Sequence, residues 1–600
     1  MRYSFHEKWL LYAGVPEKEV KTKAHIALER AKRFPWPHSR LYFINSRFIN
    51  WALPFFVLGK LKRAQDLSSN DFELFTKKIK EHSWWLIRIA AVFAFAPLIE
   101  VLIKEETAGF LDKHPLRMLK LENNKSGDER YVVIVIGSGA GGAPVARDLA
   151  GEGFKVAIIE KGDVIELLSA PRMLEKYYVG QGLTLSFSGG VMLVLAGSTV
   201  GGTTSINSGT CLRPFKHCLE EWDRVLNTSF SNGALDPYFS RVEEAVSVCT
   251  PPRSLLSKSA ELFDRGLQAI GREGAYVLPR CIKDCEGSGR CCFGCPTGAK
   301  QSTDYAYLPQ AIKDGAQLYK KTKALQVKEK PEGVEVVIEN EEGKKTLSAN
   351  YLVVSGGALF TPGILKKNKL GAAFSIAGRN LKIHPATKVF AYFPDHFHGE
   401  KGIPQGLGYR PPELPRITLE GIHTPKSMIG QILSVGGKEF NWWMERAEYL
   451  SSFGLMMQDR NTGSIREFNS FPLIDYKLHP EDARDMGKGL ILIAEAFFAA
   501  GAVKVLLPLS GNIKKEYDSA EELKSLKPEI FGTKSMIISG FHPQGTAGMG
   551  RVVDTDLKLL GSKKVYVCDA SVLPDSPGVN PQITIMALSL RLAEHLEKRI

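Results

Sequence analysis

One stretch decides the fold of this chain: Tyr131-Val132-Val133-Ile134-Val135-Ile136-Gly137-Ser138-Gly139-Ala140-Gly141-Gly142. The run from Tyr131 to Ile136 predicts a buried strand, and the glycines that follow predict a tight turn. Residues 143–150 then predict a helix, residues 155–159 a second strand, and Glu160 ends that strand. Strand, turn, helix and strand in this order predict a βαβ unit with a parallel sheet.

The glycines of this turn have the spacing of a dinucleotide-binding loop. Gly137 permits the tight turn, Gly139 lets the backbone approach a pyrophosphate, and Gly142 lets the helix pack on the strand. Alone, such a pattern is often only a glycine-rich turn. Here Glu160 follows 23 residues after Gly137, where an acidic side chain binds ribose hydroxyls. The context therefore favours dinucleotide binding, and the strand end at Glu160 resembles that of FAD-binding proteins more than NAD-dependent dehydrogenases.

Composition indicates a large globular protein. The 600 residues are 44% hydrophobic and 24% charged, which excludes global disorder. The net charge is +13, and residues 1–120 contain more Lys and Arg than Asp and Glu. A basic, aromatic-rich segment suits an anionic membrane surface or an acidic partner, although a solvated helical face explains it equally well. No basic run accompanies a nucleic-acid-binding motif, so nucleic acid is not an expected partner.

Residues 1–125 predict a helical N-terminal extension with two apolar stretches. Residues 48–59 are too few to span a bilayer, and residues 84–103 are interrupted by Arg88, Pro97 and Glu100. A core helix or a membrane-adsorbed helix is therefore favoured over a spanning one. Residues 122–130 predict a linker. The N-terminus shows no secretory signal, so we expect a cytoplasmic protein, with peripheral membrane contact as an option.

The rest of the chain predicts a mixed architecture. Alternating apolar residues from Thr322 to Ser355 predict antiparallel strands, and the C-terminal segment predicts a strand and a closing helix from about Pro581 to Lys598. We expect an α/β (α+β) fold with a Rossmann-type FAD-binding domain and a substrate domain on an antiparallel sheet. The expected segments are 1–125 (extension), 126–215 (Rossmann part), 216–371 (cap, cysteine-rich turn and return), 372–539 (substrate domain) and 540–600 (catalytic loop and closing segment).

Further motifs extend over about four-fifths of the chain. A second glycine cluster occupies residues 197–209 (GSTVGGTTSINSG), and segments 356–362 (GGALFTP) and 380–385 (NLKIHP) follow. Residues 568–574 (CDASVLP) and 578–582 (GVNPQ) form a closing motif. Together, in this order, they resemble the signatures of the glucose–methanol–choline oxidoreductases. Residues 1–125 lie outside the resemblance.

The resemblance implies one FAD and identifies the residues that would bind it. Some family members attach FAD through a histidine where this chain has Ile206, so non-covalent binding is expected. The candidate cofactor-binding residues are Gly137, Gly139, Gly142, Glu160, Gly201, Gly202, Thr203, Asn207, Asp569, Ala570, Asn580, Pro581 and Gln582.

The catalytic candidates are His542 and Asn580. Oxidation of an alcohol needs a group that takes the hydroxyl proton while hydride leaves, and imidazole suits this because its pKa lies near working pH. His542 stands in Gly540-Phe541-His542-Pro543-Gln544, which resembles the catalytic histidine segment of the family. Asn580 would orient the alcohol by hydrogen bonding. Any single histidine is more often structural, and His217 and His384 are interpreted so.

Five of the nine cysteines lie between Cys281 and Cys295. The spacing of Cys285, Cys291 and Cys295 resembles the iron–sulfur site in FAD subunits of bacterial membrane-bound sugar dehydrogenases. Long-chain alcohol oxidases of plants and yeasts carry a similar turn followed by Gly-x-Lys, here Gly298 to Lys300, without an implied cluster. Zinc is a further option. An iron–sulfur cluster, zinc and a structural turn all stay open.

Three functions are compatible with the sequence. The favoured one is oxidation of a hydrophobic primary alcohol by an FAD-dependent oxidase or dehydrogenase. The second is a sugar, polyol or sterol dehydrogenase that passes electrons through an iron–sulfur cluster to a quinone or cytochrome. The third is a flavin-binding electron-transfer partner without an alcohol substrate, which would have no need of His542 with Asn580. The electron acceptor would be oxygen, a quinone or a cytochrome.

Overall fold

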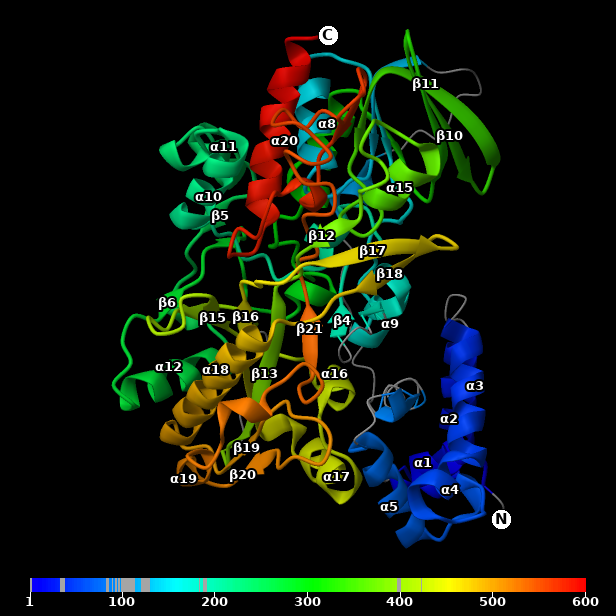
Figure 1. Ribbon diagram of the computed structural model, residues 1–600, viewed down its shortest axis with the longest axis vertical. Coiled ribbons are helices and arrows are strands. Elements are labelled where there is room, and N and C mark those ends of the chain that lie inside the picture. Colours follow the sequence, from blue (N-terminus) through cyan, green and yellow to red (C-terminus); the bar gives the residue numbers. More distant parts are fainter. Residues whose placement is uncertain are drawn as a thin grey trace.

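The structure is a computed structural model, and it describes residues 3–600 except 14, 33–37, 83–85, 89, 92–93, 95–97, 99–113, 120–129, 183, 187–191, 396–400 and 422. Most of the apolar stretch at 84–103 and all of the predicted linker at 122–130 except Arg130 therefore lie outside the described residues. Arg130 begins a strand instead. Figure 1 shows the βαβ part with α20 and α8 at one end, the second sheet at the other, and the N-terminal helices beside the latter.

The first sheet has seven strands in the order β8-β2-β1-β11-β10-β9, with β22 beside β11. Strands β8, β2, β1, β11 and β22 are parallel, as expected for a Rossmann-type unit, and β9 to β11 form the antiparallel strands predicted between residues 322 and 355. The strands are β1 (Arg130–Ile136), β2 (Val156–Ile159), β8 (Gln317–Tyr319), β9 (Lys323–Lys330), β10 (Gly333–Asn340), β11 (Gly343–Val354) and β22 (Val565–Val567).

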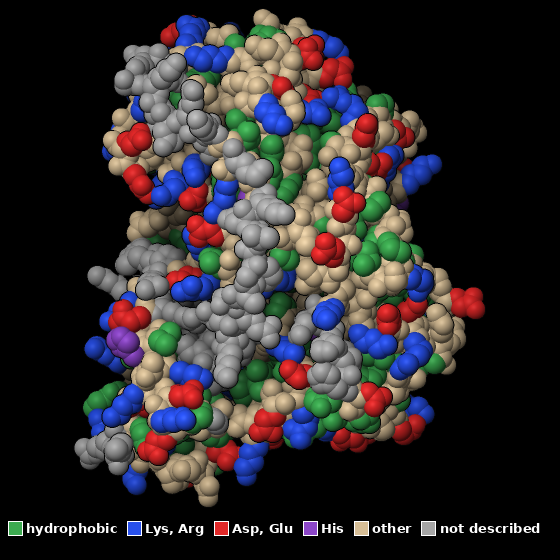
Figure 2. Space-filling model, turned by 180° about the vertical axis from the view of Figure 1, so that it is seen from behind, with side chains coloured by type: hydrophobic (Ala, Val, Ile, Leu, Met, Phe, Trp, Pro, Cys, Tyr) green, Lys and Arg blue, Asp and Glu red, His purple; other side chains and the backbone are tan. Residues whose placement is uncertain are grey.

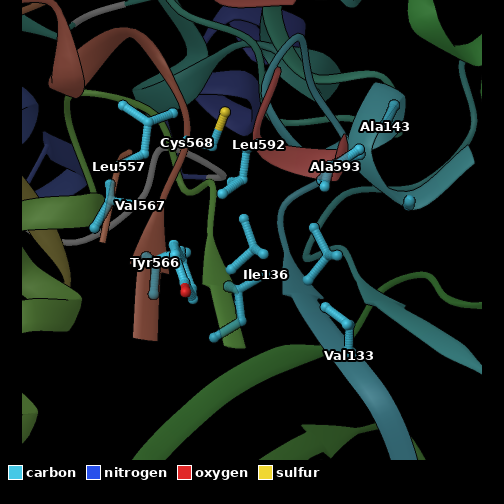
Figure 3. Packing of buried hydrophobic residues seen from close by; sticks show 14 of the residues in the cluster. Val133, Ile136, Ala143, Leu557, Tyr566, Val567, Cys568, Leu592 and Ala593 are labelled. Atoms are coloured by element: carbon cyan, nitrogen blue, oxygen red, sulfur yellow. The ribbon is translucent and has the colours of Figure 1, made fainter. Parts of the chain in front are cut away.

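The core of this part contains side chains from both the first glycine turn region and the C-terminal helix. Val133 and Ile136 on β1, Ala143 on α8, Val567 on β22 and Leu592 on α20 lie together in one buried cluster (Figure 3). Helix α20 packs on α8 and α11. Burying these side chains stabilises the fold by about 1.5–3 kcal/mol for each large one. The closing helix is therefore part of the same domain as the first glycine turn, although more than 400 residues separate them.

The second sheet has thirteen mostly antiparallel strands in the order β12-β17-β18-β3-β4-β21-β13-β16-β15-β14-β6, with β19 on β13 and β20 on β19. Helices α12 and α18 pack on each other and on β16. The strands are β3 (Leu185–Ser186), β4 (Met192–Val194), β6 (Tyr276–Val277), β12 (Arg379–Leu381), β13 (Pro385–Tyr392), β14 (Leu407–Tyr409), β15 (Ile417–Glu420), β16 (Leu450–Met457), β17 (Gly463–Phe468), β18 (Phe471–Asp475), β19 (Lys504–Leu506), β20 (Glu516–Tyr517) and β21 (Ile538–Gly540).

Both predicted layers are thus present, and the α/β fold class is confirmed. Both sheets draw strands from several of the predicted segments, so the exact domain boundaries stay a prediction.

A separate pair, β5 (Val248–Cys249) and β7 (Arg280–Cys281), lies near the cysteine-rich turn. The helices of the two parts are α8 (Gly142–Gly151), α9 (Ala170–Tyr177), α10 (Lys216–Leu226), α11 (Asp236–Ala245), α12 (Lys258–Ala269), α13 (Thr303–Ala306), α14 (Leu308–Lys313), α15 (Thr361–Asn368), α16 (Lys426–Ile432), α17 (Gly437–Glu445), α18 (Pro480–Ala499), α19 (Ala520–Leu523) and α20 (Gln582–Glu597).

The N-terminal extension is helical, as predicted, and packs on the second sheet. Phe75 and Ile79 of α5 share a buried cluster with Phe390 of β13 and Trp443 of α17. Lys77 forms an ion pair of 2.5 Å with a carboxylate of α17. Among the described residues, no helix has both the length and the apolar character that a membrane span requires. The helices of the extension are α1 (Phe5–Tyr12), α2 (Glu17–Lys32), α3 (His38–Trp51), α4 (Leu53–Leu58), α5 (Ser69–Lys80) and α7 (Pro115–Met118).

The face seen from behind carries mixed charges. Figure 2 shows Lys and Arg side chains interspersed with Asp and Glu over the described part of that face, without a single basic field.

Candidate active site

One cavity of about 920 Å³ lies where the two sheets meet, and most of the predicted cofactor-binding residues line it. The β1–α8 turn, the second glycine cluster, β13, β21 and the start of α20 all contribute to its wall. The predicted residues on the wall are Gly137, Gly139, Glu160, Gly202, Thr203, Asn207, Asp569, Ala570, Asn580, Pro581 and Gln582. Gly142 and Gly201 are not on the wall, and both act through packing instead.

The glycines of the first turn divide into packing and lining positions. A Cβ on Gly142 would lie 1.9 Å from the carbonyl oxygen of Gly137, so α8 approaches β1 as closely as the sequence predicts. A Cβ on Gly141 would lie 1.7 Å from the carbonyl oxygen of Cys568. At Gly139, in contrast, the nearest atoms to a Cβ are 3.8 Å away. Of these three glycines, Gly139 alone leaves open space beside its Cα on the cavity wall, which fits a pyrophosphate at the start of α8.

Glu160 lines the cavity and forms hydrogen bonds with the glycine turn. Its carboxylate accepts hydrogen bonds from the backbone N–H of Ser138 (3.1 Å), from the Ser138 hydroxyl (2.8 Å) and from the N–H of Gly162 (2.8 Å). A carboxylate has about four lone-pair positions, so acceptor capacity remains for a ribose hydroxyl. The acid thus holds the turn and still faces the cavity.

The start of α20 is tied to the second glycine cluster. The side-chain amide of Asn207 donates to Gln582 (2.8 Å), and the Gln582 amide donates to the carbonyl of Thr210 (2.7 Å). The Oδ1 atoms of Asn207 and Asn580 are buried without a hydrogen-bond partner in the structure. Buried polar atoms normally have partners, so two orphaned acceptors on one cavity wall fit the polar edge of a bound ring system.

Asp569 connects the closing motif to the segment that begins at Gly356. Its carboxylate accepts from the N–H of Gly357 (2.9 Å), the hydroxyl of Thr361 (2.5 Å) and the N–H of Ser571 (2.7 Å). Burial raises the pKa of Asp569 above its usual value. The three donors hold the loops of the closing motif in place around the cavity.

His542 and Asn580 lie beside each other, as the sequence predicts. The Nε2 atom of His542 is 3.4 Å from the amide nitrogen of Asn580. The backbone N–H of His542 donates to the carbonyl of Ile383 (3.1 Å), which fixes the loop after β21 against β13. Burial lowers the pKa of His542 from 6.5 to about 4, so the ring is neutral at pH 7.

His384 contacts the predicted catalytic histidine, a contact that its interpretation as a structural residue did not include. Its Nδ1 is 3.0 Å from Nδ1 of His542, and its Nε2 is 2.5 Å from the Ser576 hydroxyl and 3.1 Å from the Gln544 amide. The ring is fully buried, and burial lowers its pKa well below the ordinary value. The signal in the sequence was the segment of residues 380–385, which carries His384 but gives no hint of its partner. Neither His384 nor His217, which lies on α10, is on the cavity wall.

Glu420 was not identified from the sequence. It ends β15 and is buried, and its Oε1 is 3.4 Å from the amide nitrogen of Asn580. Burial raises the pKa of Glu420 from 4.5 to about 7. A carboxyl group that titrates near neutral pH thus lies next to the catalytic candidates.

The predicted metal site at Cys285, Cys291 and Cys295 is not found. Among the described residues, no group of three or more His, Cys, Asp or Glu side chains could hold a metal ion. Cys291 Sγ accepts from Arg280 at 3.4 Å, and Cys295 Sγ lies 3.5 Å from the hydroxyl of Thr297. The sulfur atoms of Cys291 and Cys295 therefore have different hydrogen-bond partners.

Lys300 organises the cysteine-rich turn instead. Its ammonium group is buried and donates to the carbonyls of Ser205 (2.8 Å), Asn207 (2.9 Å) and Cys291 (2.8 Å). These three bonds use all the donors of a lysine. The turn is thereby held against the second glycine cluster, which supports the interpretation as a structural turn.

The chain is similar in sequence to known oxidoreductases. The sequence models of the GMC oxidoreductase family match residues 174–386 and 468–589. An uncharacterized GMC-type oxidoreductase of Mycobacterium tuberculosis is 31% identical over 78% of this chain and 76% of its own length. A long-chain-alcohol oxidase of Arabidopsis thaliana is 28% identical over 79% of this chain and 69% of its own length.

The fold also matches solved structures. A formate oxidase of Aspergillus oryzae, described with FAD modification, has a TM-score of 0.57, with 15% identity over 79% of this chain and 99% of that chain. At that identity the match shows the fold alone. The chain therefore belongs to the GMC oxidoreductase family and is an FAD-dependent oxidoreductase.

Proposed function

We propose that this protein oxidises a hydrophobic primary alcohol at the CH–OH group, with His542 as the general base. The observation that carries the proposal is the pair His542 and Asn580 on the wall of a cavity that also contains the bare backbone of Gly139. The similarity to a long-chain-alcohol oxidase supports this substrate class. A flavin-binding partner without a substrate would have no use for the pair.

The chain supplies a proton acceptor where the alcohol would react. FAD, when bound, supplies the hydride acceptor. Because the pKa of His542 is lowered to about 4, its ring is unprotonated and able to accept the hydroxyl proton at pH 7. Its Nε2 faces the cavity next to Asn580, while Nδ1 faces His384. His542 is therefore held through Nδ1, and Nε2, beside the Asn580 amide at 3.4 Å, is the nitrogen that would take the substrate proton.

The contacts of His384 are compatible with the tautomer of His542 that the proposal requires. For Nε2 of His542 to accept a proton, Nδ1 must carry hydrogen and donate to His384. His384 then carries its own proton on Nε2 and donates to Ser576. With the oxygen and nitrogen of the Gln544 side-chain amide exchanged, its Oε1, which otherwise has no partner, accepts from the same Nε2–H of His384. One consistent network thus presents the lone pair of His542 to the substrate.

Asn580 and the start of α20 complete the site. The Oδ1 of Asn580 has no partner in the structure and is available to the substrate hydroxyl. The N-cap of α20, Pro581, provides no side-chain cap, and both Pro581 and Gln582 line the cavity. The uncapped N–H groups and the helix dipole favour negative charge at this end, which suits a reduced flavin ring.

We propose non-covalent FAD. Ile206 lines the cavity at the position where some family members have a linking histidine, and a hydrocarbon side chain cannot form that bond. The acceptor that reoxidises the flavin is oxygen, a quinone or a cytochrome. The iron–sulfur route of the alternative sugar, polyol or sterol dehydrogenase has no support from the cysteine-rich turn as folded.

Rapid-mixing measurements of flavin reduction test the proposal. We expect dodecanol to reduce the flavin of anaerobic holoenzyme, and glucose to be much slower, because the cavity wall near the second sheet is largely apolar. His542→Ala should slow the reduction by about 10²–10⁴-fold while FAD stays bound. Reduction at the wild-type rate in His542→Ala would remove this residue from the mechanism. Repeating turnover with oxygen and with a quinone identifies the acceptor.

We also propose peripheral membrane contact through α3 and α4. Trp51, Phe55 and Phe56 are 64%, 49% and 69% exposed. Lys60 and Lys62 follow directly in the sequence, and Arg63 lies over the Trp51 ring at 5.1 Å. Exposed aromatics beside basic residues suit an anionic lipid surface.

A further inference from the structure

The last helix of the extension, α7, packs on the part of the fold that contains the first sheet, unlike α5. It contacts α13 and α14. Leu116 of α7 is buried in the same core cluster as Val133 and Leu592. The residue before the helix is His114, which is 4% exposed and whose ring centre lies 4.6 Å from that of Tyr305. The extension thus reaches the part of the molecule that contains the first glycine turn.

His114 forms a buried hydrogen bond with Asp304. Its Nε2 is 2.9 Å from Oδ2 of Asp304, and Asp304 is 2% exposed. The Nδ1 of His114 accepts from the backbone N–H of Leu116 (3.3 Å), so Nε2 carries the hydrogen and donates to the carboxylate. Burial raises the pKa of Asp304, but hydrogen bonds, first the one from His114, lower it more, so the pKa lies below its usual value. The carboxylate is therefore ionised and is held by a residue of the extension.

Asp304 lies directly against the second glycine cluster. Gly201 has a φ of +85°, and a Cβ there would lie 2.9 Å from Oδ1 of Asp304 and 2.1 Å from the hydroxyl oxygen of Ser205. The hydroxyl of Thr303 is 3.2 Å from the carbonyl oxygen of Gly201, and the N–H of Thr303 donates to the hydroxyl of Thr204 (3.1 Å). The position of α13 therefore sets the position of the glycine cluster.

The second glycine cluster in turn contacts the first glycine turn. The N–H of Gly201 donates to the hydroxyl of Ser138 (3.0 Å), and this hydroxyl donates to Glu160 (2.8 Å). A Cβ on Gly202 would lie 3.1 Å from the Cα of Gly139, and both glycines line the cavity. A continuous chain of contacts therefore connects the extension to the residues that would bind the pyrophosphate and the ribose of FAD.

We propose that His114 is a positioning residue for FAD, and that the extension determines through it how tightly the cofactor is held. His114 holds Asp304, Asp304 and Thr303 hold the second glycine cluster, and the cluster packs against Gly139. The inference concerns the affinity for FAD and does not depend on which alcohol is oxidised. His114 lies outside the regions that the family models match. A segment outside those regions thus contributes to the cofactor site.

Titration of the full-length apoprotein with FAD, followed by quenching of flavin fluorescence, tests the inference. In His114→Leu, which has an apolar side chain without a donor, the dissociation constant for FAD should rise about fivefold or more. In His114→Gln, whose side-chain amide can donate to Asp304 in place of Nε2, it should stay within about twofold of the wild-type value. His25→Leu is the matched control, because His25 is an exposed histidine of the same extension, and it should bind FAD like the wild type.

A second measurement distinguishes cofactor positioning from a general loss of stability. The melting temperatures of the apoprotein and of the FAD-saturated protein give the stabilisation that FAD provides, which depends on its dissociation constant. This stabilisation should shrink in His114→Leu and be retained in His114→Gln and His25→Leu. A rise of less than about fivefold in the dissociation constant of His114→Leu, or an equal rise in His114→Gln, would overturn the inference. A melting temperature of His114→Leu that falls equally with and without FAD would overturn it as well.

Discussion

The backbone of His384 is strained next to the proposed catalytic base. Its φ is +48°, in the left-handed region that costs a non-glycine residue about 1–3 kcal/mol. The surrounding bonds to His542, Ser576 and Gln544 hold the ring in place. The role is non-local, because Pro385 meets Gly540 only through the pairing of β13 with β21. No spacing within residues 380–385 could have predicted that contact.

The pH dependence of flavin reduction follows from two pKa values. His542 titrates near 4, and its neutral form is the base, so the rate constant should fall below about pH 4 and be level near pH 5–6. Glu420 titrates near 7, and its ionised form stabilises a protonated His542, so a second rise is expected above pH 7. In Glu420→Gln the second rise should vanish while the first remains. A profile that keeps both rises would exclude Glu420 as their source.

Elements whose pattern of apolar residues lies within their own segment could be predicted from the sequence. The run of residues 131–136 became β1, the glycines became its turn, and residues 322–355 became three antiparallel strands. In each case the pattern that buries the strand lies within the strand itself. The cysteine-rich turn differs, because ligand types and spacing say nothing about where each side chain points. Its structure depends on Lys300, whose carbonyl partners include two that precede it by more than 90 residues.

Removal of the Lys300 ammonium group should loosen this turn. Lys300→Met leaves the carbonyls of Ser205, Asn207 and Cys291 without their donor, and each buried, unsatisfied group costs about 1–3 kcal/mol. We expect a lower melting temperature and faster loss of FAD on dilution, because the turn supports the second glycine cluster. Lys283→Met, at an exposed lysine of the same turn, is the control and should retain both properties. Equal behaviour of the two variants would contradict a supporting role for the turn.

For the molecule as a whole, the extension has two distinct surfaces. Phe75 of α5 is fully buried in the cluster that also contains Phe390 and Trp443, whereas Phe56 of α4 is 69% exposed. The first surface joins the extension to the second sheet, and the second faces outward. Deleting residues 1–120 would therefore expose part of the core, and we expect that deletion to aggregate. Single substitutions at Phe75 and Phe56 distinguish the roles of the two surfaces better than this deletion does.

Phe75→Ala should lower the unfolding free energy by about 3–5 kcal/mol, as for other large buried aromatics, and lower the melting temperature accordingly. Phe56→Ser should leave the melting temperature close to the wild-type value, since exposed positions change stability by about 0.5 kcal/mol or less. In sedimentation with vesicles containing phosphatidylserine, Phe56→Ser should instead bind less than Phe75→Ala. Binding of the wild type should also weaken at 1 M salt, where the Debye length is about 3 Å. Wild-type protein that stays unbound at low salt would rule out the lipid contact. Equal melting temperatures for the two variants would show that the extension is not part of the common core.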